Sequence, residues 1–261
     1  MKAYAKAIYD TRYFWFHLAR SDLRNRFRRS KLGILWSMMT PLLLTIIMAT
    51  VFGTVFGLPL GDFAPYVLSG LIVWDIIVSS FVGGSNAIIS SEQYIRQANH
   101  PLTIYSLKWA IVTITTFMIA TISLVLWMLI ASPQNILMGI VTLPVTVVIL
   151  LFLSWSITTF SSHINAKYRD FPQVIALLVQ ILWFFSPVFF QQEMFMSNPV
   201  LEMVFMYNPI THVLALVREP FLFGQLPTAQ NYAFAIGFTL AWAGIAIITH
   251  KRMRSDIIFY I

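Results

Sequence analysis

Six apolar segments, each long enough to cross a lipid bilayer as a helix, constrain this chain more than any other feature. A helix rises about 1.5 Å per residue, so roughly 20 apolar residues cross a hydrocarbon core of about 30 Å. The predicted spans are Leu32–Gly57, Phe63–Ile89, Leu102–Ile130, Ile136–Ser161, Pro172–Phe190 and Tyr232–Thr249. With 58% hydrophobic and 10% charged residues, the chain has too few polar side chains to coat a soluble globule. We therefore predict an all-α integral membrane protein with six transmembrane helices.

The basic residues are distributed unevenly around these spans. Every Lys and Arg except Arg218 lies before the first span, near the second–third or fourth–fifth connection, or after the sixth span. Because cytoplasmic loops are enriched in Lys and Arg, both termini are predicted to be cytoplasmic. The densest cluster directly precedes the first span and comprises Arg24, Arg26, Arg28, Arg29 and Lys31. Anchoring the topology would be a sufficient role for this cluster, and a second role in ligand binding stays open.

The chain divides into residues 1–31, a cytoplasmic interface helix with a basic gate segment, and residues 32–261, the transmembrane domain. In the first part, Tyr4, Ile8, Trp15 and Leu18 recur near helical spacing among charged residues. This pattern predicts an amphipathic helix lying in the headgroup zone of the membrane.

The segment at about 199–224 is hydrophobic but is not predicted to be a span. The pair Asn208 and Pro209 interrupts it, and charged residues including Arg218 and Glu219 leave no apolar run of sufficient length. We interpret it as two short re-entrant helices on the extracytoplasmic side, before the last span. An amphipathic surface loop is the alternative.

Signatures of catalysis are missing from the sequence. It contains no GxxxxGK[ST] phosphate loop, no HExxH, no GxSxG and no cysteine. The chain is therefore predicted to be neither an enzyme nor an ATPase, and no metal or cofactor is expected in it. Asp75 is the one carboxylate deep inside a predicted span, so it is either a functional residue facing a pathway or subunit contact, or a hydrogen-bonded buried group.

Aromatic residues, 15% of the chain, have two possible roles. Most aromatics in membrane helices pack in the core or form interface belts. If some line a pore, their flat faces offer a sliding surface to sugar rings. The pore candidates are Trp36, Tyr66, Trp74, Phe81 and Phe185.

Four stretches together resemble a known family. They are DLRNRFRRSKLGILWSMMTP (Asp22–Pro41), IRQANHP (Ile95–Pro101), RDFPQVIALLVQILWFFSPVFF (Arg169–Phe190) and NPITHVLALVREPFLFG (Asn208–Gly224). In this order, with six spans, they resemble the polysaccharide-exporting ABC transporter permeases, type-2 ABC exporters of the Wzm kind that export lipid-linked O-antigen. Capsule and teichoic-acid permeases share much of the pattern.

The resemblance implies a function and partners. It implies a homodimer in the bacterial inner membrane, driven by two copies of a separate ATPase subunit that holds ATP and Mg. The substrate would be a polyprenyl-linked glycan for lipopolysaccharide biosynthesis, and membrane lipid but no nucleic acid would be a partner. The implied ATPase-coupling residues are Glu92, Gln93, Tyr94, Ile95, Arg96, His100 and Pro101, and the basic cluster would bind the lipid pyrophosphate at the gate.

Other functions stay open at this level. A capsule or teichoic-acid exporter fits the same motifs, and so does an ABC permease with a drug or lipid as cargo. An ion-coupled secondary carrier would need intramembrane charge pairs or repeated broken helices, which the sequence does not display beyond Asp75. A membrane enzyme or assembly scaffold would need a cluster of polar residues, and the sequence does not display one.

Overall fold

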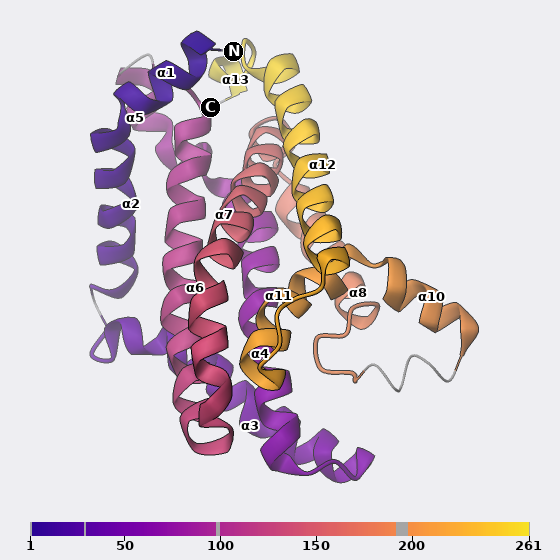
Figure 1. Ribbon diagram of the computed structural model, residues 1–261. Helices are drawn as coiled ribbons and strands as arrows, with labels where there is room; N and C mark the ends of the chain where they lie inside the picture. The colour runs from indigo at the N-terminus through magenta and orange to yellow at the C-terminus, as the bar shows by residue number, and fades with distance from the viewer. Residues whose placement is uncertain (1, 29, 98–99, 192–197, 261) are drawn as a thin grey trace.

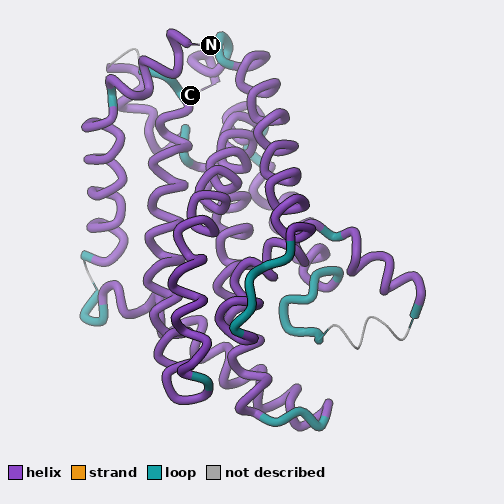
Figure 2. The backbone as a smooth tube through the Cα atoms, viewed as in Figure 1, coloured by secondary structure: helices purple, strands orange, loops and turns teal. Residues whose placement is uncertain are grey.

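The computed structural model describes residues 2–28, 30–97, 100–191 and 198–260, and the regular elements within these ranges are all helical (Figures 1 and 2). The first helix, α1 (Lys2–Asp10), and the last, α13 (Ile257–Tyr260), lie at the same end of the bundle (Figure 1). The short helix α5 (Glu92–Gln97) lies at that end as well. The all-helical prediction is confirmed, whereas the side of the membrane that this end faces stays a prediction.

The amino-terminal region forms two helices where one was expected. After α1, the helix α2 (Arg12–Phe27) begins a new direction and runs alongside α6 (Figure 1). The Thr11 hydroxyl donates to the carbonyls of Ala7 and Ile8, a local side-chain bond that favours a helix break. The apolar side of both helices packs against the start of α6, with Leu18 only 5% exposed. A location in the headgroup zone stays a prediction.

Five predicted spans are confirmed as helical segments long and apolar enough to cross a bilayer. These segments are Gly33–Phe56, Leu60–Asn86, Thr103–Ala131, Pro133–Lys167 and Ala229–Met253. Their main helices are α3 (Trp36–Phe56), α4 (Leu60–Val78), α6 (Thr103–Ala131), α7 (Ile136–Lys167) and α12 (Ala229–Met253). Short helices η1 (Gly33–Leu35) and η5 (Pro133–Asn135) begin two of the segments.

Helix α4 forms the centre of the bundle. In the most apolar 18-residue stretch of the segment that contains α4, 67% is buried. The corresponding share is 17% in the segments that contain α3 and α12. Its side chains Ile72 and Ile76 belong to a core that also includes Leu153 of α7 and Val217 of α11 (Pro209–Phe223). The exposed apolar surfaces of α3 and α12 are therefore left to contact lipid or another protein chain.

The end of α4 is fixed tightly to α7. The chain continues from α4 through a π-helical turn, η2 (Ser79–Gly83), and a 3-10 turn, η3 (Gly84–Asn86). The hydroxyl oxygens of Ser80 and Ser154 are 2.7 Å apart, and a Cβ at Gly84 would lie 2.7 Å from Oγ1 of Thr158. After the turn η4 (Ile89–Ser91) the chain enters α5, so this contact positions the segment that leads to α5.

The predicted fifth span, Pro172–Phe190, is too long at its carboxyl end. Helix α8 (Phe171–Phe184) has only 14 residues, a length of about 21 Å, which is short of a bilayer core. Pro187 cannot donate a helical hydrogen bond, and the carbonyls of Pro187 and Val188 accept bonds from Arg218 instead. That the predicted span Pro172–Phe190 crosses the membrane therefore stays a prediction.

The segment at 199–224 does form two short helices, α10 (Pro199–Tyr207) and α11. The Asn208 side chain accepts from the backbone N–H of Ile210 and caps α11, while Gly224 ends that helix in the left-handed conformation at φ 66°. Helix α10 projects from the bundle, whereas α11 packs against α4, α7 and α12 (Figure 1). The alternative of a surface loop therefore does not hold for α11, and entry into the outer leaflet stays a prediction.

Candidate functional site

A cavity of about 460 Å³ opens between α2, α3, α4, α6 and α8. Most of its wall is apolar. The polar and aromatic side chains that line it are Arg26, Phe27, Ser30, Trp36, Ser37, Thr40, Trp74, Asp75, Thr116, Phe117 and Trp183. An apolar cavity with a few convergent polar groups is the usual form of a binding site for an amphiphilic molecule.

The predicted gate residues lie at this cavity only in part. Arg26 lines it at the carboxyl end of α2, and Arg26 and Arg28 also line an adjoining recess with Asn25 and Ser30. Arg24 and Lys31 are exposed but line neither space. Arg29 lies outside the described residues. Among the described residues of the cluster, Arg26 and Arg28 are therefore the cations that line these two spaces, and a role in ligand binding stays a prediction.

Asp75 faces the cavity from the last turn of α4. Its side chain is exposed, whereas its neighbour Trp74 is 6% exposed and its other neighbour Ile76 is 1% exposed. No ion pair of the described residues includes Asp75, and Arg26 is the cation that shares its cavity. The Asp75 side chain therefore lines a cavity and is not enclosed between helices, and its role in a pathway or subunit contact stays a prediction.

Two of the five aromatic pore candidates lie at the cavity. Trp36 is 45% exposed and its indole Nε1 donates to the Ser30 hydroxyl at 3.2 Å, which places the ring beside the end of α2. Trp74 contacts Trp183 edge to face, with ring centroids 5.2 Å apart. A cluster of three tryptophans from α3, α4 and α8 therefore lines the cavity.

The other three aromatic candidates do not line it. The Tyr66 hydroxyl donates to the Phe190 carbonyl at 2.8 Å, and the Tyr66 ring packs under Arg218. Phe81 is buried against Trp242, with ring centroids 5.1 Å apart. Phe185 is 49% exposed and lines neither this cavity nor the recess beside Trp183. Tyr66 and Phe81 therefore have packing roles in this chain.

The predicted coupling segment packs against the start of α2. The ring of Phe14 contacts both His100, with centroids 4.7 Å apart, and Tyr94, with centroids 6.0 Å apart. Ile95 packs on the cluster that contains Leu18, and Glu92 accepts a hydrogen bond from Arg96 at 2.8 Å. Residues 98–99 lie outside the described ranges. Helix α2 therefore contacts the coupling segment at one end and the cavity at the other.

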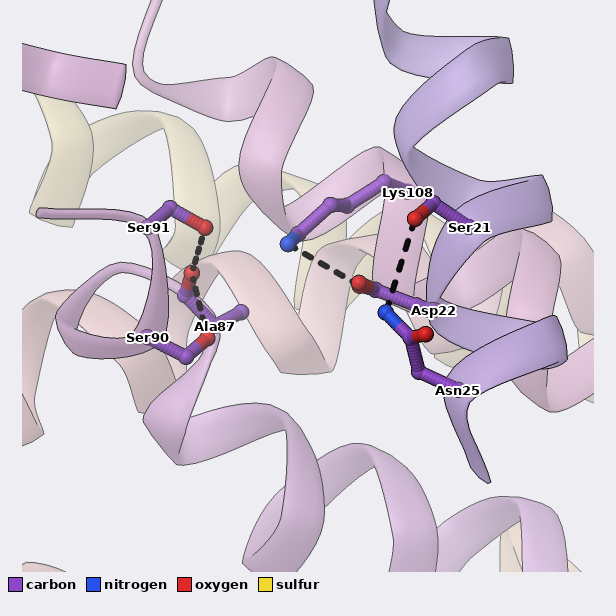
Figure 3. Close-up of polar contacts among 7 residues, drawn as sticks. All are labelled: Ser21, Asp22, Asn25, Ala87, Ser90, Ser91 and Lys108. Carbon is purple, nitrogen blue, oxygen red and sulfur yellow. Dashed lines mark hydrogen bonds and ion pairs between the residues drawn. The ribbon is translucent and has the colours of Figure 1, made fainter. Parts of the chain in front are cut away.

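An ion pair between a buried lysine of α6 and a partly exposed aspartate of α2 joins these two helices between the two ends. Nζ of Lys108 lies 2.9 Å from Oδ2 of Asp22, and the side chain of Lys108 is only 3% exposed (Figure 3). The two side chains point toward each other from α6 and α2, next to the turn at Ala87, whose carbonyl accepts from Ser90 and Ser91 (Figure 3). An ammonium group removed from water needs this carboxylate, so the pair sets the position of α2.

Arg218 is enclosed by the segment that follows α8. Its guanidinium donates to the carbonyls of Pro187 at 2.6 Å and Val188 at 2.5 Å, and to the carbonyl of Tyr66 at 3.2 Å. It also lies 3.7 Å from the centre of the Tyr66 ring. The planar guanidinium suits this role because it binds several acceptors at once and stacks on an aromatic ring.

The neighbouring Glu219 holds the start of α12. Its carboxylate accepts from the backbone N–H of Thr228 at 3.1 Å and from the Asn231 side chain at 2.5 Å. Burial raises the pKa of the Glu219 carboxyl, and the hydrogen bonds from Asn231 and Thr228 oppose that rise. Arg218 and Glu219 therefore connect α11 to α4, to the segment after α8 and to α12.

Sequence reasoning missed three residues of this region. Trp183 lines the cavity, Gln180 lines a neighbouring recess beside it, and Lys108 forms the ion pair with Asp22. A glutamine inside an apolar helix and a lysine nearly two turns inside a predicted span were the available signals, since both are costly in lipid unless a partner or a cavity receives them. Within the described residues, no group of three His, Asp or Glu side chains forms a metal site.

Long apolar helices around a cavity with mixed polarity define an integral membrane protein with a binding space between its helices. The family model of the ABC-2 type transporters matches residues 13–222, and this chain belongs to that family.

Curated relatives match the chain over nearly its full length. It is 23% identical to the O-antigen export system permease protein RfbA of Myxococcus xanthus over 95% of both chains. It is 22% identical to the RfbA permease of Klebsiella pneumoniae over 91% of both chains. It is also 24% identical to the polysialic acid transport protein KpsM of Escherichia coli, over 88% of this chain and 89% of the relative.

Proposed function

We propose that this chain is the transmembrane permease subunit of an ABC exporter that moves a lipid-linked polysaccharide of the O-antigen type across the inner membrane of a bacterium. The observation that carries the proposal is the match to O-antigen export permeases over 95% of the chain. The cavity between α2, α3, α4, α6 and α8 adds a place where such a substrate can bind. The chain transports and does not catalyse, because ATP hydrolysis belongs to a separate subunit.

The chemistry of the cavity suits a polyprenyl-pyrophosphate glycan. Arg26 and Arg28 can bind the anionic pyrophosphate through charge-assisted hydrogen bonds. The flat faces of Trp36 and Trp183 offer apolar surface to sugar rings, and the Asp75 carboxylate can accept hydrogen bonds from their hydroxyl groups. The polyprenyl tail can stay in the lipid, since the adjoining surfaces of α3 and α8 are apolar and exposed.

Helix α2 offers a route from the ATPase to this cavity. Along this helix, Phe14 at the coupling segment lies about 18 Å from Arg26 at the cavity. The Asp22–Lys108 pair fixes it to α6 along the way. In the proposed mechanism, ATP-driven closure of the two ATPase subunits moves residues 92–101, and α2 transmits the movement to the basic rim. ATP must change the relative stability of two states of the pathway for this to drive export.

The working unit is proposed to be two copies of this chain with two ATPase subunits, and both termini are proposed to lie in the cytoplasm. Five or six helices form a small bundle for enclosing a glycan. Exposed apolar residues on α3 and α8, such as Ile47 and Leu177, leave surface for contact with a second copy or with lipid. In this arrangement each copy contacts an ATPase subunit that binds ATP and Mg. The chain itself has no phosphate loop for that purpose.

Reconstitution tests the proposal directly. The chain and its ATPase, together in proteoliposomes, should move a polyprenyl-linked glycan only when ATP is hydrolysed. The matched control replaces the phosphate-loop lysine of the ATPase, and glycan movement should then stop. Transport driven by an ion gradient in the absence of the ATPase would contradict the proposal and support a secondary carrier.

Removal of the two cations at the cavity should reduce export. In the double variant Arg26→Gln/Arg28→Gln, we expect glycan export to fall by about tenfold or more, because each charge-assisted bond contributes about 1.5–3 kcal/mol. The measurement is surface glycan per assembled transporter. The control Lys6→Gln/Arg20→Gln removes the same charge from exposed positions that line neither the cavity nor the adjoining recess. Equal export in both double variants would show that the cluster only sets topology.

Replacement of Asp75 tests the wall of the cavity. Asp75→Asn keeps the size of the side chain but removes the charge, so we expect export to fall by several-fold while assembly is unchanged, because an ionised acceptor binds hydroxyl donors more strongly. Asp62→Asn is the control, an exposed carboxylate in the first turn of the same helix. Unchanged transport in Asp75→Asn would exclude a role for this carboxylate in the pathway.

Capsular polysaccharide is the second candidate substrate. The similarity to the polysialic acid transport protein KpsM covers 88% of the chain and favours it. Expression in a cell that lacks both its O-antigen exporter and its capsule exporter distinguishes the two substrates. The chain and its ATPase should restore only one of these two surface glycans.

A further inference from the structure

A second cavity, of about 410 Å³, lies between α1, the start of α6, the second half of α7 and the second half of α12. It shares no lining residue with the cavity beside Asp75. Its walls come mainly from α7 and α12, and Tyr4 of α1 closes one side. The proposed export pathway does not use it.

The polarity of this cavity changes along one face of α12. Ala243 and Ile247 lie one helical turn apart and line its apolar part, opposite Phe152 and Trp155 of α7. The small side chain of Ala243 leaves room between the two helices. One turn beyond Ile247, Lys251 lines the cavity, and Arg254 follows on the same face. An apolar groove therefore ends at two cations.

These two cations are available to a ligand. Both side chains are exposed, and neither takes part in an ion pair within the described part of the chain. The nearest carboxylate in sequence, Asp256, accepts a hydrogen bond from Ser255 at 2.7 Å and does not line the cavity. The charge at this end of the cavity is therefore uncompensated and suits an anion.

A buried histidine pair adds hydrogen-bonding capacity beside the cations. Nδ1 of His163 lies 2.7 Å from the Thr159 carbonyl, so that nitrogen carries the proton. A neutral His163 then accepts at Nε2 from Nδ1 of His250, 3.0 Å away. This leaves Nε2 of His250 as a buried acceptor with no partner in the described residues, and His250 lines the cavity. A ligand with a hydroxyl group can donate a hydrogen bond to Nε2 of His250, whereas a hydrocarbon ligand would leave this nitrogen without a partner.

We propose that this cavity binds an anionic phospholipid of the cytoplasmic leaflet, of the phosphatidylglycerol type. The phosphate lies between Lys251 and Arg254, and one acyl chain lies along Ala243, Ile247 and Phe152. The choice of leaflet follows from the proposed cytoplasmic location of the termini. A lipid in this position contacts α1, α7 and α12 together, so it supports the packing of the amino-terminal helix on the bundle.

Native mass spectrometry of the full-length chain in detergent tests the site, with phosphatidylglycerol and phosphatidylcholine of identical acyl chains as probes. We expect retention of phosphatidylglycerol over phosphatidylcholine, and about 25-fold weaker phosphatidylglycerol binding in K251Q/R254Q, since each cation near an anionic lipid contributes about a factor of five. The matched control R20Q/R252Q removes two exposed cations that do not line the cavity, and it should bind as the native chain does.

A third variant tests the apolar part separately. Ala243→Phe fills the groove and keeps both cations, so retention of phosphatidylglycerol should also fall. Equal affinity for the two lipids, an equal loss in R20Q/R252Q, or unchanged binding in both K251Q/R254Q and Ala243→Phe would each overturn the proposal. Thermal melting of each variant in detergent establishes that the helices are still packed when binding is measured.

Discussion

Asp22→Asn should lower the free energy of unfolding of the detergent-solubilised protein by about 2–4 kcal/mol. Lys108 is 3% exposed and its ammonium group is paired with this carboxylate at 2.9 Å, so the substitution leaves a buried charge without its counterion. We expect a lower midpoint of thermal unfolding and faster hydrogen exchange along α2. Export should fall with it, because α2 is the proposed route from the coupling segment to the cavity.

Two further variants separate the charge from the packing. Asp10→Asn removes an exposed carboxylate of α1 and should leave the unfolding midpoint unchanged. The double variant Asp22→Leu/Lys108→Met replaces the pair by apolar side chains and should recover most of the stability, because no buried charge is left unpaired. If Asp22→Asn melts at the native temperature with α2 still protected from exchange, the pair does not set the position of α2.

Arg218→Gln should have the largest effect on folding, a loss of about 3–5 kcal/mol. Arg218 is 6% exposed, and its guanidinium binds the carbonyls of Pro187 and Val188, which follow the end of α8, and the carbonyl of Tyr66 on α4. A glutamine side chain is shorter and has one donor group, so buried carbonyls are left without partners. The measurement is the fraction of monodisperse protein after extraction from membranes, together with its unfolding midpoint.

Lysine provides the sharper comparison at this position. Arg218→Lys keeps the positive charge but loses the planar fork that reaches several carbonyls and the Tyr66 ring, so it should rescue little of the loss. Arg169→Gln is the control, since Arg169 is exposed and donates to a single carbonyl, that of Tyr260. A stable Arg218→Lys variant would mean that charge alone, and not the shape of the guanidinium, holds the segment after α8.

The sequence predicts several residues of the candidate site but not the complete set of residues that line it. The basic cluster, Asp75 and Trp36 were all selected from residue type and position, and the structure brings Arg26, Trp36 and Asp75 to one cavity. Tyr66 and Phe81 were selected by the same reasoning but have packing roles. The face of a helix that an aromatic residue occupies depends on the neighbouring helices, and an almost uniformly apolar span carries too weak a periodicity to predict it.

The sequence by itself determined that this chain is a helical membrane protein, because runs of about 20 apolar residues have no other stable arrangement in lipid. It also determined the break at Asn208 and Pro209, because proline and an amide cap act within one turn of the chain. Only the tertiary structure decided that α8 stops at Phe184, that Lys108 pairs with Asp22, and that Arg218 binds the carbonyls beyond α8. These features join residues from 30 to more than 80 positions apart, and a buried charge or an unpaired carbonyl finds its partner only when the helices have packed.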